Sequence, residues 1–400
     1  MFSPPLKEHQ PRVDWPLLTA LLGLMVIGVL FIASATLVTE ADRPLALWQR
    51  AWFKQAVSCL LGLVAGGLLC LVPYHTLARW SLLAYWGMIL LLVAVLVVGA
   101  VRFGARRWID LGPVQFQPSE FAKLAFILAL AHFLSRPWEE LRSPLVFLQA
   151  LGLTVLPFVL ILAEPDLGSA LVLLPIGLGM LFVAGVPTRY LWRLVGGMGV
   201  VVGLLLVDVL FAPPKWQFKL EPYQRRRLLV YFNKDFVPPG ATEAERQRAL
   251  KEQRDASYNV EQALISVGSG GLTGKGWRQG TQNALGYLPR AVARNDFIFS
   301  VIAEESGFVG SVLVLGLYLV VLFSGIRIAG QARDRLGKLV ATGVVILLFS
   351  HVFINIGMNI RLMPVTGIPL PLLSYGGTSV VCSLIAAGLL QNVYLFRHHY

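Results

Sequence analysis

Charged residues are scarce in this 400-residue sequence, where Asp, Glu, Lys and Arg together make up 14%. Soluble domains carry roughly 25%, so the composition argues against a soluble enzyme or binding domain. Hydrophobic residues make up 56% and form long runs, and about 20 mostly apolar residues suffice to cross a bilayer. The sequence therefore predicts an integral membrane protein that contacts membrane lipids.

Cysteine is also scarce, and tandem repeats and low-complexity segments are lacking. The three cysteines, Cys59, Cys70 and Cys382, lie in apolar runs without a C-x-x-C spacing, which argues against a cysteine metal or redox centre. The formal charge of +12 does not indicate a nucleic-acid partner. Cationic loops of membrane proteins set topology and face anionic lipid or phosphate.

Ten apolar runs predict an all-α fold of about ten transmembrane helices, at 17–37, 53–72, 81–101, 121–134, 145–163, 167–186, 194–212, 297–326, 339–360 and 373–395. The first run is long enough to span and follows a polar stretch, so it is not read as a cleavable signal. The predicted organisation is a tail (1–16), seven helices (17–212), a long loop (213–296), three helices (297–396) and a second tail (397–400).

Orientation follows from lysine and arginine in the short loops, which are more numerous on the side of the N-terminus. The positive-inside rule then places both tails in the cytoplasm and the loop 213–296 outside. A loop of this length is usually functional or disordered. Its aromatic residues, glycines and charges predict a surface that folds back on the membrane domain, with a short exposed helix over 242–254.

Three charged residues at the ends of spans are expected to meet. Glu120 and Lys123 are three apart and share one helix face, and Asp166 in the short turn 163–168 can reach Lys123. Charges at membrane depth are costly, and they are usually paired or functional. We expect a buried charge cluster, whether structural or functional, and an N-cap by Asp166 is compatible with it.

An aromatic and basic string lies just before the fourth span. Trp108 is either an interfacial belt residue or a platform on which a sugar stacks. Arg106 and Arg107 precede it in the sequence.

The glycine-rich segment 268–276 does not fit a nucleotide P-loop, because Gly276 follows Lys275 where Ser or Thr is required. Glycine instead lets the backbone approach a ligand or a neighbouring helix. Lys275 would then be placed to meet phosphate.

Asp296 lies where the long loop meets the eighth span, with Glu304 and Glu305 about two turns inside. Three carboxylates here are hard to explain as packing. Asp296 stands at the water boundary with cationic neighbours such as Arg294, so we predict it to be a general base. The alternative role of a helix N-cap does not exclude this.

The segment 363–379 contains three prolines and paired glycines, which cannot form a regular helix. Irregular backbone at membrane depth survives only where it is buried in protein or lines a cavity. Because this segment lies on the same outer side as Asp296, it predicts a substrate cavity there.

Together these segments resemble the SEDS family of peptidoglycan polymerases, which comprises RodA, FtsW and SpoVE. The similarity runs from the first span to the last. The most specific strings stand in family order: Arg107-Trp-Ile, Gln117-Pro-Ser-Glu, Pro165-Asp-Leu-Gly, Gly268-Ser-Gly-Gly-Leu, Gly280-Thr-Gln, Asp296-Phe-Ile-Phe and Ser374-Tyr-Gly-Gly. The string 364–371 looks like the RodA branch. The chain departs from the family at Pro289-Arg290, at Arg294-Asn295, at Arg361 and in extra sequence around 237–256.

The resemblance implies a ten-helix protein of the bacterial inner membrane that polymerises lipid II into glycan strands for elongation and rod shape. It implies an inverting transfer with Asp296 as catalytic base, and a class B, PBP2-like penicillin-binding protein as partner. A divalent cation, Mg²⁺ or Mn²⁺, is the one cofactor considered, and no metal ligands are assigned. The expected substrate-binding residues are Trp108, Arg106, Arg107, Lys275, Gln282, Arg294 and Ser374.

Two other functions remain open. The same cavity and charges fit a transporter that moves lipid II across the bilayer. A non-catalytic scaffold for the penicillin-binding protein is the third reading, although a scaffold has no need of Asp296 at a polar cavity mouth.

Overall fold

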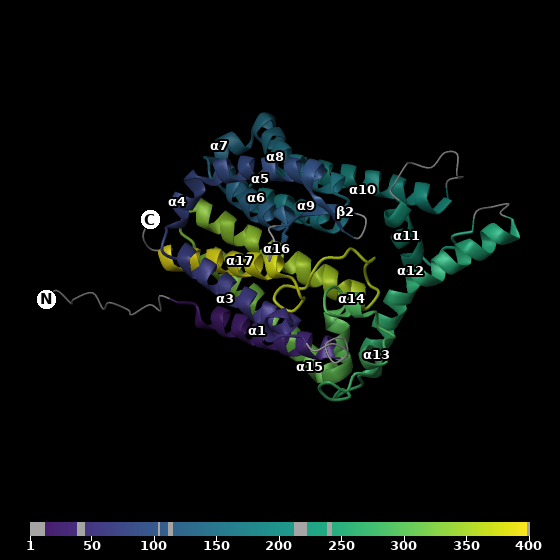
Figure 1. The fold of residues 1–400 in the computed structure, drawn as a ribbon. Coiled ribbons are helices and arrows are strands. Elements are labelled where there is room, and N and C mark those ends of the chain that lie inside the picture. The colour runs from purple at the N-terminus through teal and green to yellow at the C-terminus, as the bar shows by residue number, and fades with distance from the viewer. Residues whose placement is uncertain are drawn as a thin grey trace.

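A computed structural model describes residues 13–37, 45–102, 105–110, 115–211, 222–237 and 242–397. Most of both predicted tails, and residues 238–241 of the extra sequence, lie outside this range. The described chain is a bundle of long helices (Figure 1). They are α1 (Trp15–Ala35), α3 (Ala51–Leu69), α5 (Ser81–Val98), α6 (Pro118–Leu134), α8 (Pro144–Ala163), α9 (Leu167–Ala184), α10 (Thr188–Phe211), α15 (Ile298–Gln331), α16 (Arg335–Asn359) and α17 (Gly377–Phe396).

Nine of these helices, among the described residues, are long and apolar enough to cross a membrane. The tenth, α6, has 17 residues, which is the lower end of the spanning range. It also carries Glu120 and Lys123, both buried. The predicted all-α membrane fold of about ten helices is therefore confirmed.

The helices are arranged around α16 and α17. In Figure 1, α5, α6, α8 and α9 lie on one side of this pair, and α1, α3 and α15 lie on the other. Helices α3 and α17 cross at close range because glycines meet there. A Cβ atom added to Gly388 would lie 2.6 Å from the Cα of Gly66, so a larger residue would force the two spans apart.

The two ends of the described bundle lie together. Asp14 caps α1 through its side chain, and its backbone N–H donates to Oε1 of Gln391 near the end of α17, at 3.2 Å. Arg327 on α15 pairs with the Asp14 carboxylate at 2.5 Å. A chain whose ends share one side crosses the bundle an even number of times, in agreement with ten spans.

A small sheet that the sequence did not predict precedes α6. Strands β1 (Ala100–Arg102), β2 (Ala105–Asp110) and β3 (Gln115–Phe116) pair antiparallel in the order β1-β2-β3. The Thr378 hydroxyl donates to the backbone O of Gln115 at 2.7 Å. This bond fastens the sheet to the first turn of α17. Three further short helices join the spans: η1 (Leu47–Gln49), α4 (Tyr74–Arg79) and α7 (Trp138–Leu141).

The described part of the long connection between α10 and α15 is mostly helical. It contains α11 (Pro222–Tyr231), α12 (Glu243–Ser269), α13 (Thr281–Ala284) and α14 (Arg290–Ala293), and α11 and α12 extend past the bundle in Figure 1. The predicted short helix over 242–254 was wrong in length. A capping box of Thr242 and Glu245 begins α12, but buried Val260 and Ala263 carry it on against α15.

The glycine-rich segment 268–276 approaches a neighbouring helix, as one reading of the sequence predicted. Helix α15 leaves helical geometry at Gly307 (φ 68°, ψ −161°). There the backbone N–H groups of Lys275 and Gly276 donate to the carbonyls of Glu304 and Glu305, at 3.0 and 2.9 Å. The loop thus satisfies carbonyl groups that the kink releases from the helix.

Two glycines allow this close contact to be tested. Gly274 (φ +79°) and Gly286 (φ +76°) share left-handed geometry, but only at Gly274 would a Cβ clash, 2.2 Å from the backbone O of Glu305. We expect Gly286→Ala to cost about 1–2 kcal/mol for the conformation alone. Gly274→Ala should cost at least about twice that amount. Thermal unfolding of both variants in detergent checks this, and equal losses would contradict it.

Candidate active site

Asp296 lies between α14 and α15. The N-cap position of α15 is Phe297, and no side chain caps the helix. The alternative role of Asp296 as an N-cap is therefore not found. Its side chain is partly buried and forms no hydrogen bond that caps the start of α15.

Two asparagines on α16 hold the Asp296 backbone. The side-chain amides of Asn355 and Asn359 both donate to the backbone O of Asp296, each at 3.1 Å. Asn359 Oδ1 in turn accepts from the Ser300 hydroxyl at 2.6 Å. The sequence analysis missed Asn359. The available signal was a pair of amides four apart, and hence on one face of an apolar span.

The irregular segment between α16 and α17 supports the same loop. It is non-helical over 363–369 and buried at most positions from Ile368 to Ser374, as predicted for irregular backbone at membrane depth. The Ser374 hydroxyl donates to the backbone O of Asn295 at 2.6 Å and accepts from the Leu370 N–H at 2.8 Å. Ser374 thus fixes the chain beside Asp296, and a contact between Ser374 and substrate stays a prediction.

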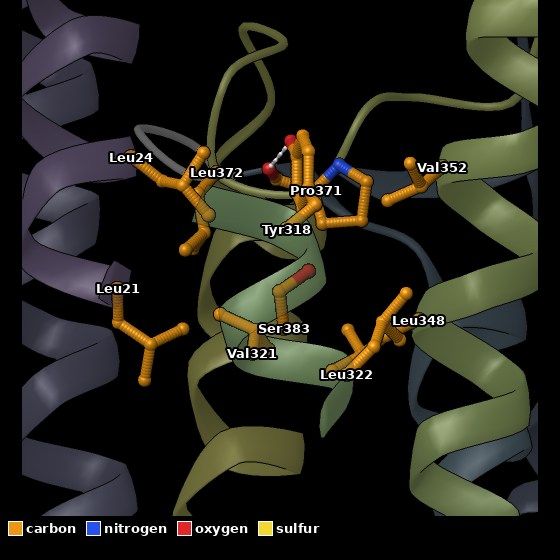
Figure 2. Close-up of a pocket in the computed structure, with 10 residues that line it drawn as sticks. All are labelled: Leu21, Leu24, Tyr318, Val321, Leu322, Leu348, Val352, Pro371, Leu372 and Ser383. Carbon is orange, nitrogen blue, oxygen red and sulfur yellow. Dashed lines mark hydrogen bonds between the residues drawn. The ribbon is translucent and has the colours of Figure 1, made fainter. Parts of the chain in front are cut away.

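A small apolar cavity lies beneath this segment (Figure 2). The Tyr318 hydroxyl donates to the backbone O of Pro371 at 2.5 Å across its top. Its volume of about 10 Å³ is close to the minimum for one water molecule. It cannot hold a sugar, so the candidate site is the polar surface around Asp296.

Several segments bring charges to Asp296. Burial raises the pKa of its carboxyl above the ordinary value, Arg227 on α11 and Arg107 on β2 lower it, and Asp166 raises it. A Cβ atom on Gly367 would lie 3.7 Å from Asp296 Oδ2. The sheet, the α8–α9 turn and α11 therefore carry the charges that act on this carboxyl, and the irregular segment lies beside it.

The predicted charge cluster is divided in two. Lys123 Nζ pairs with Glu120 at 2.7 Å, as expected, and also contacts His351 Nε2 at 2.9 Å. Asp166, however, contacts neither Glu120 nor Lys123 among the described interactions. It caps α9 through Ser169 N and lies 3.6 Å from Arg107. The prediction failed for Asp166 because the sheet that supplies Arg107 was not foreseen.

A second cluster lies about 10 Å further along α15, by the rise of the helix. Lys275 Nζ pairs with Glu304 Oε1 at 2.6 Å, and the Gln282 backbone N–H donates to the same oxygen at 3.0 Å. The Ser34 hydroxyl donates to Glu305 at 2.5 Å. Glu304 and Glu305 thus hold the glycine-rich loop and α1 to α15. Substrate contacts of Lys275 and Gln282 stay predictions.

The remaining predicted residues lie on β2 or beside Asp296. Arg294 places its guanidinium 4.9 Å from the centre of the Tyr375 ring, and its buried Nε has no hydrogen bond among the described residues. Trp108 follows Arg107 on β2, so it points to the opposite face of the strand. The backbone of Arg106 pairs with Val101, and the Arg106 side chain lies outside the described structure.

The model of a cell cycle protein family that comprises FtsW, RodA and SpoVE matches residues 15–399. The chain belongs to this family. The peptidoglycan glycosyltransferase MrdB of Escherichia coli K12 is 36% identical over 388 residues, covering 96% of this chain and 94% of MrdB. The peptidoglycan glycosyltransferase RodA of Treponema pallidum is 33% identical over 443 residues, covering 95% and 97%. Stage V sporulation protein E of Bacillus subtilis is 37% identical over 394 residues, covering 97% and 98%.

Solved structures of the FtsW/RodA/SpoVE fold agree with this assignment. The crystal structure of RodA from Thermus thermophilus has a TM-score of 0.63 at 30% identity, covering 96% of this chain and 98% of that one. A chain from a study of polymerization and crosslinking by a peptidoglycan synthase complex has a TM-score of 0.77 at 30% identity, covering 98% and 100%. The predicted family, membrane fold and glycosyltransferase class are thereby confirmed.

Proposed function

We propose that this protein polymerises lipid II into glycan strands for cell elongation, with Asp296 as the general base. One observation carries the proposal. Asp296 is fixed through its backbone by Asn355 and Asn359, while its carboxyl has two arginines among its electrostatic partners. A raised pKa brings a carboxylate closer to the operating pH, where general-base catalysis is most effective.

The reaction is a single displacement at the anomeric carbon of the donor. The 4-hydroxyl of the acceptor GlcNAc attacks this carbon of the diphosphate-linked MurNAc, and a new C–O bond forms. The bond to the diphosphate oxygen breaks, and the leaving group takes the electron pair. Asp296 accepts the hydroxyl proton, and attack from the opposite face inverts the configuration.

The leaving diphosphate needs cationic stabilisation. Arg107 and Arg227 both act on the Asp296 carboxyl, and guanidinium groups bind phosphate through paired hydrogen bonds. Arg294 lies two residues before Asp296 and supplies a third cation. Among the described residues, no three His, Cys, Asp or Glu side chains gather as metal ligands.

The site is proposed to face the periplasm, with both tails in the cytoplasm. A structural relative comes from a complex in which polymerization and crosslinking are coordinated. This supports a class B, PBP2-like penicillin-binding protein as the partner that crosslinks the new strands.

A lipid II assay in detergent tests the function. The purified protein, with and without the partner, is incubated with lipid II, and glycan length is read on a gel. Detergent micelles have no leaflets to cross, so a transporter makes no product there. Glycan strands support the proposal. Movement of lipid II across vesicles by a protein that makes no glycan under either condition would contradict it.

Arg227 should set the acidic limit of activity. The base works ionised, so activity falls as pH drops through the pKa of Asp296. Removing a cation that lowers this pKa moves the loss of activity to higher pH. The pH–rate profile of Arg227→Gln checks this. Arg226→Gln is the matched control, because Arg226 forms an exposed pair with Glu252. Identical profiles for both variants would contradict the assignment.

A further inference from the structure

Glu164 lies in the turn between α8 and α9, and the proposed reaction does not use it. Its side chain is fully buried, with 0% exposed. Neither carboxyl oxygen has a hydrogen-bond partner among the described residues. An ionised carboxylate in such a place is very costly, and an orphaned polar group of this kind requires an explanation.

Among the described residues, two charged groups act on Glu164. Asp166 belongs to the same turn, and Arg107 reaches it from β2. Arg107 already lies 3.6 Å from Asp166 Oδ1. Asp166 in turn acts on Asp296, whose other charged neighbours are Arg107 and Arg227.

The guanidinium of Arg107 thus acts on both Glu164 and Asp166. Two carboxyl groups that share a site do not readily ionise together. Asp166 accepts hydrogen bonds from Ser169 N at 3.1 Å and from Gln117 Nε2 at 3.2 Å, so protein donors contact its carboxyl group. Glu164 has no such donors among the described residues. Burial and then Asp166 raise the pKa of Glu164 to about 8, against the opposing effect of Arg107.

We propose that Glu164 is a positioning residue. In its neutral form it does not compete for Arg107, which stays available to Asp166 and Asp296. Its ionisation draws Arg107 toward Glu164 and away from the site of the leaving diphosphate. Glu164 touches no reacting atom and acts only through Arg107. This inference rests on the proposed function, and it predicts a loss of activity in alkali that arises from a residue outside the catalytic machinery.

The pH–rate profile of Glu164→Gln tests the proposal, because glutamine keeps the shape and the neutral state at every pH. The wild-type rate should fall about tenfold between about pH 7 and about pH 9, as a group titrating near pH 8 ionises. Glu164→Gln should stay within about twofold of its neutral-pH rate over this range. Glu139→Gln on α7, an exposed site, should keep the wild-type profile. A Glu164→Gln rate that falls like wild type, or is already tenfold lower at neutral pH, overturns the proposal.

An infrared measurement gives a readout that does not need turnover. The difference spectrum of wild type minus Glu164→Gln should contain the carbonyl band of a protonated carboxyl at neutral pH, and the band should vanish in alkali. Its absence at neutral pH overturns the proposal even if no glycan is made.

These experiments distinguish failure of the proposed function from failure of the role assigned to Glu164. A wild-type protein that makes no glycan refutes the proposed function. If wild type is active and Asp296→Asn is not, an unchanged profile in Glu164→Gln refutes only the role of Glu164.

Thermal unfolding shows that the Glu164→Gln variant folds. Wild-type stability should fall as pH rises from about 4.5 to about 8, because the folded state holds a proton that the unfolded chain releases, and Glu164→Gln should lack this slope.

Discussion

Replacing Asp296 with asparagine is expected to slow glycan synthesis by about 10²–10⁴-fold, the usual contribution of a general base. Asparagine cannot accept the proton of the acceptor hydroxyl. The fold should survive, because Asn355 and Asn359 bind the backbone O of residue 296 and not its side chain. The initial rate of lipid II polymerisation measures the first effect, and thermal unfolding measures the second.

Asp255→Asn is the matched control for this experiment, since Asp255 is exposed on α12 and should be replaced without loss of rate. A near-normal rate for Asp296→Asn would remove Asp296 from the chemistry. A low rate accompanied by unfolding would instead make the residue structural.

Replacing Lys123 with methionine is expected to destabilise the protein by about 3–5 kcal/mol, the cost of leaving one member of a buried ion pair uncompensated. Lys123 and Glu120 are 1% and 4% exposed, so water cannot take the place of the lost partner. The double variant Lys123→Met with Glu120→Gln removes both charges. It should recover most of the loss, as measured by thermal unfolding in detergent.

Lys338→Met, at an exposed position of α16, should have little effect and controls for the loss of a lysine. Equal destabilisation by the single and double variants would show that Glu120 and Lys123 do not stabilise one another. The contact between Lys123 and His351 would then be the more important one.

The membrane fold could be predicted from the sequence, because a transmembrane helix has a simple sequence pattern. Each span is a long apolar run, and the bilayer fixes the length that a span needs. The irregular segment was predictable for a related reason, since the prolines at 364, 369 and 371 exclude a regular helix. Glycines at 268–276 correctly indicated a close backbone approach.

The grouping of the charged residues near Asp296 could not be predicted from the sequence. Strands β1 to β3 have two to six residues, too few for a period-2 pattern to emerge, so Arg107 could not be placed beside Asp166. Arg227 stands in a run of three arginines within the long loop, and a charge run alone does not distinguish a solvated face from a binding site. The proposed role of Glu164 depends on its burial. A single glutamate before a proline does not indicate burial in a sequence.

The most direct test of the account is a structure of Asp296→Asn with lipid II bound, since this variant should hold substrate without turnover. The account predicts the acceptor 4-hydroxyl about 2.6–3.2 Å from the side chain of residue 296, with the donor diphosphate against Arg107 and Arg227. An acceptor sugar bound away from residue 296, or on the cytoplasmic surface, would contradict it.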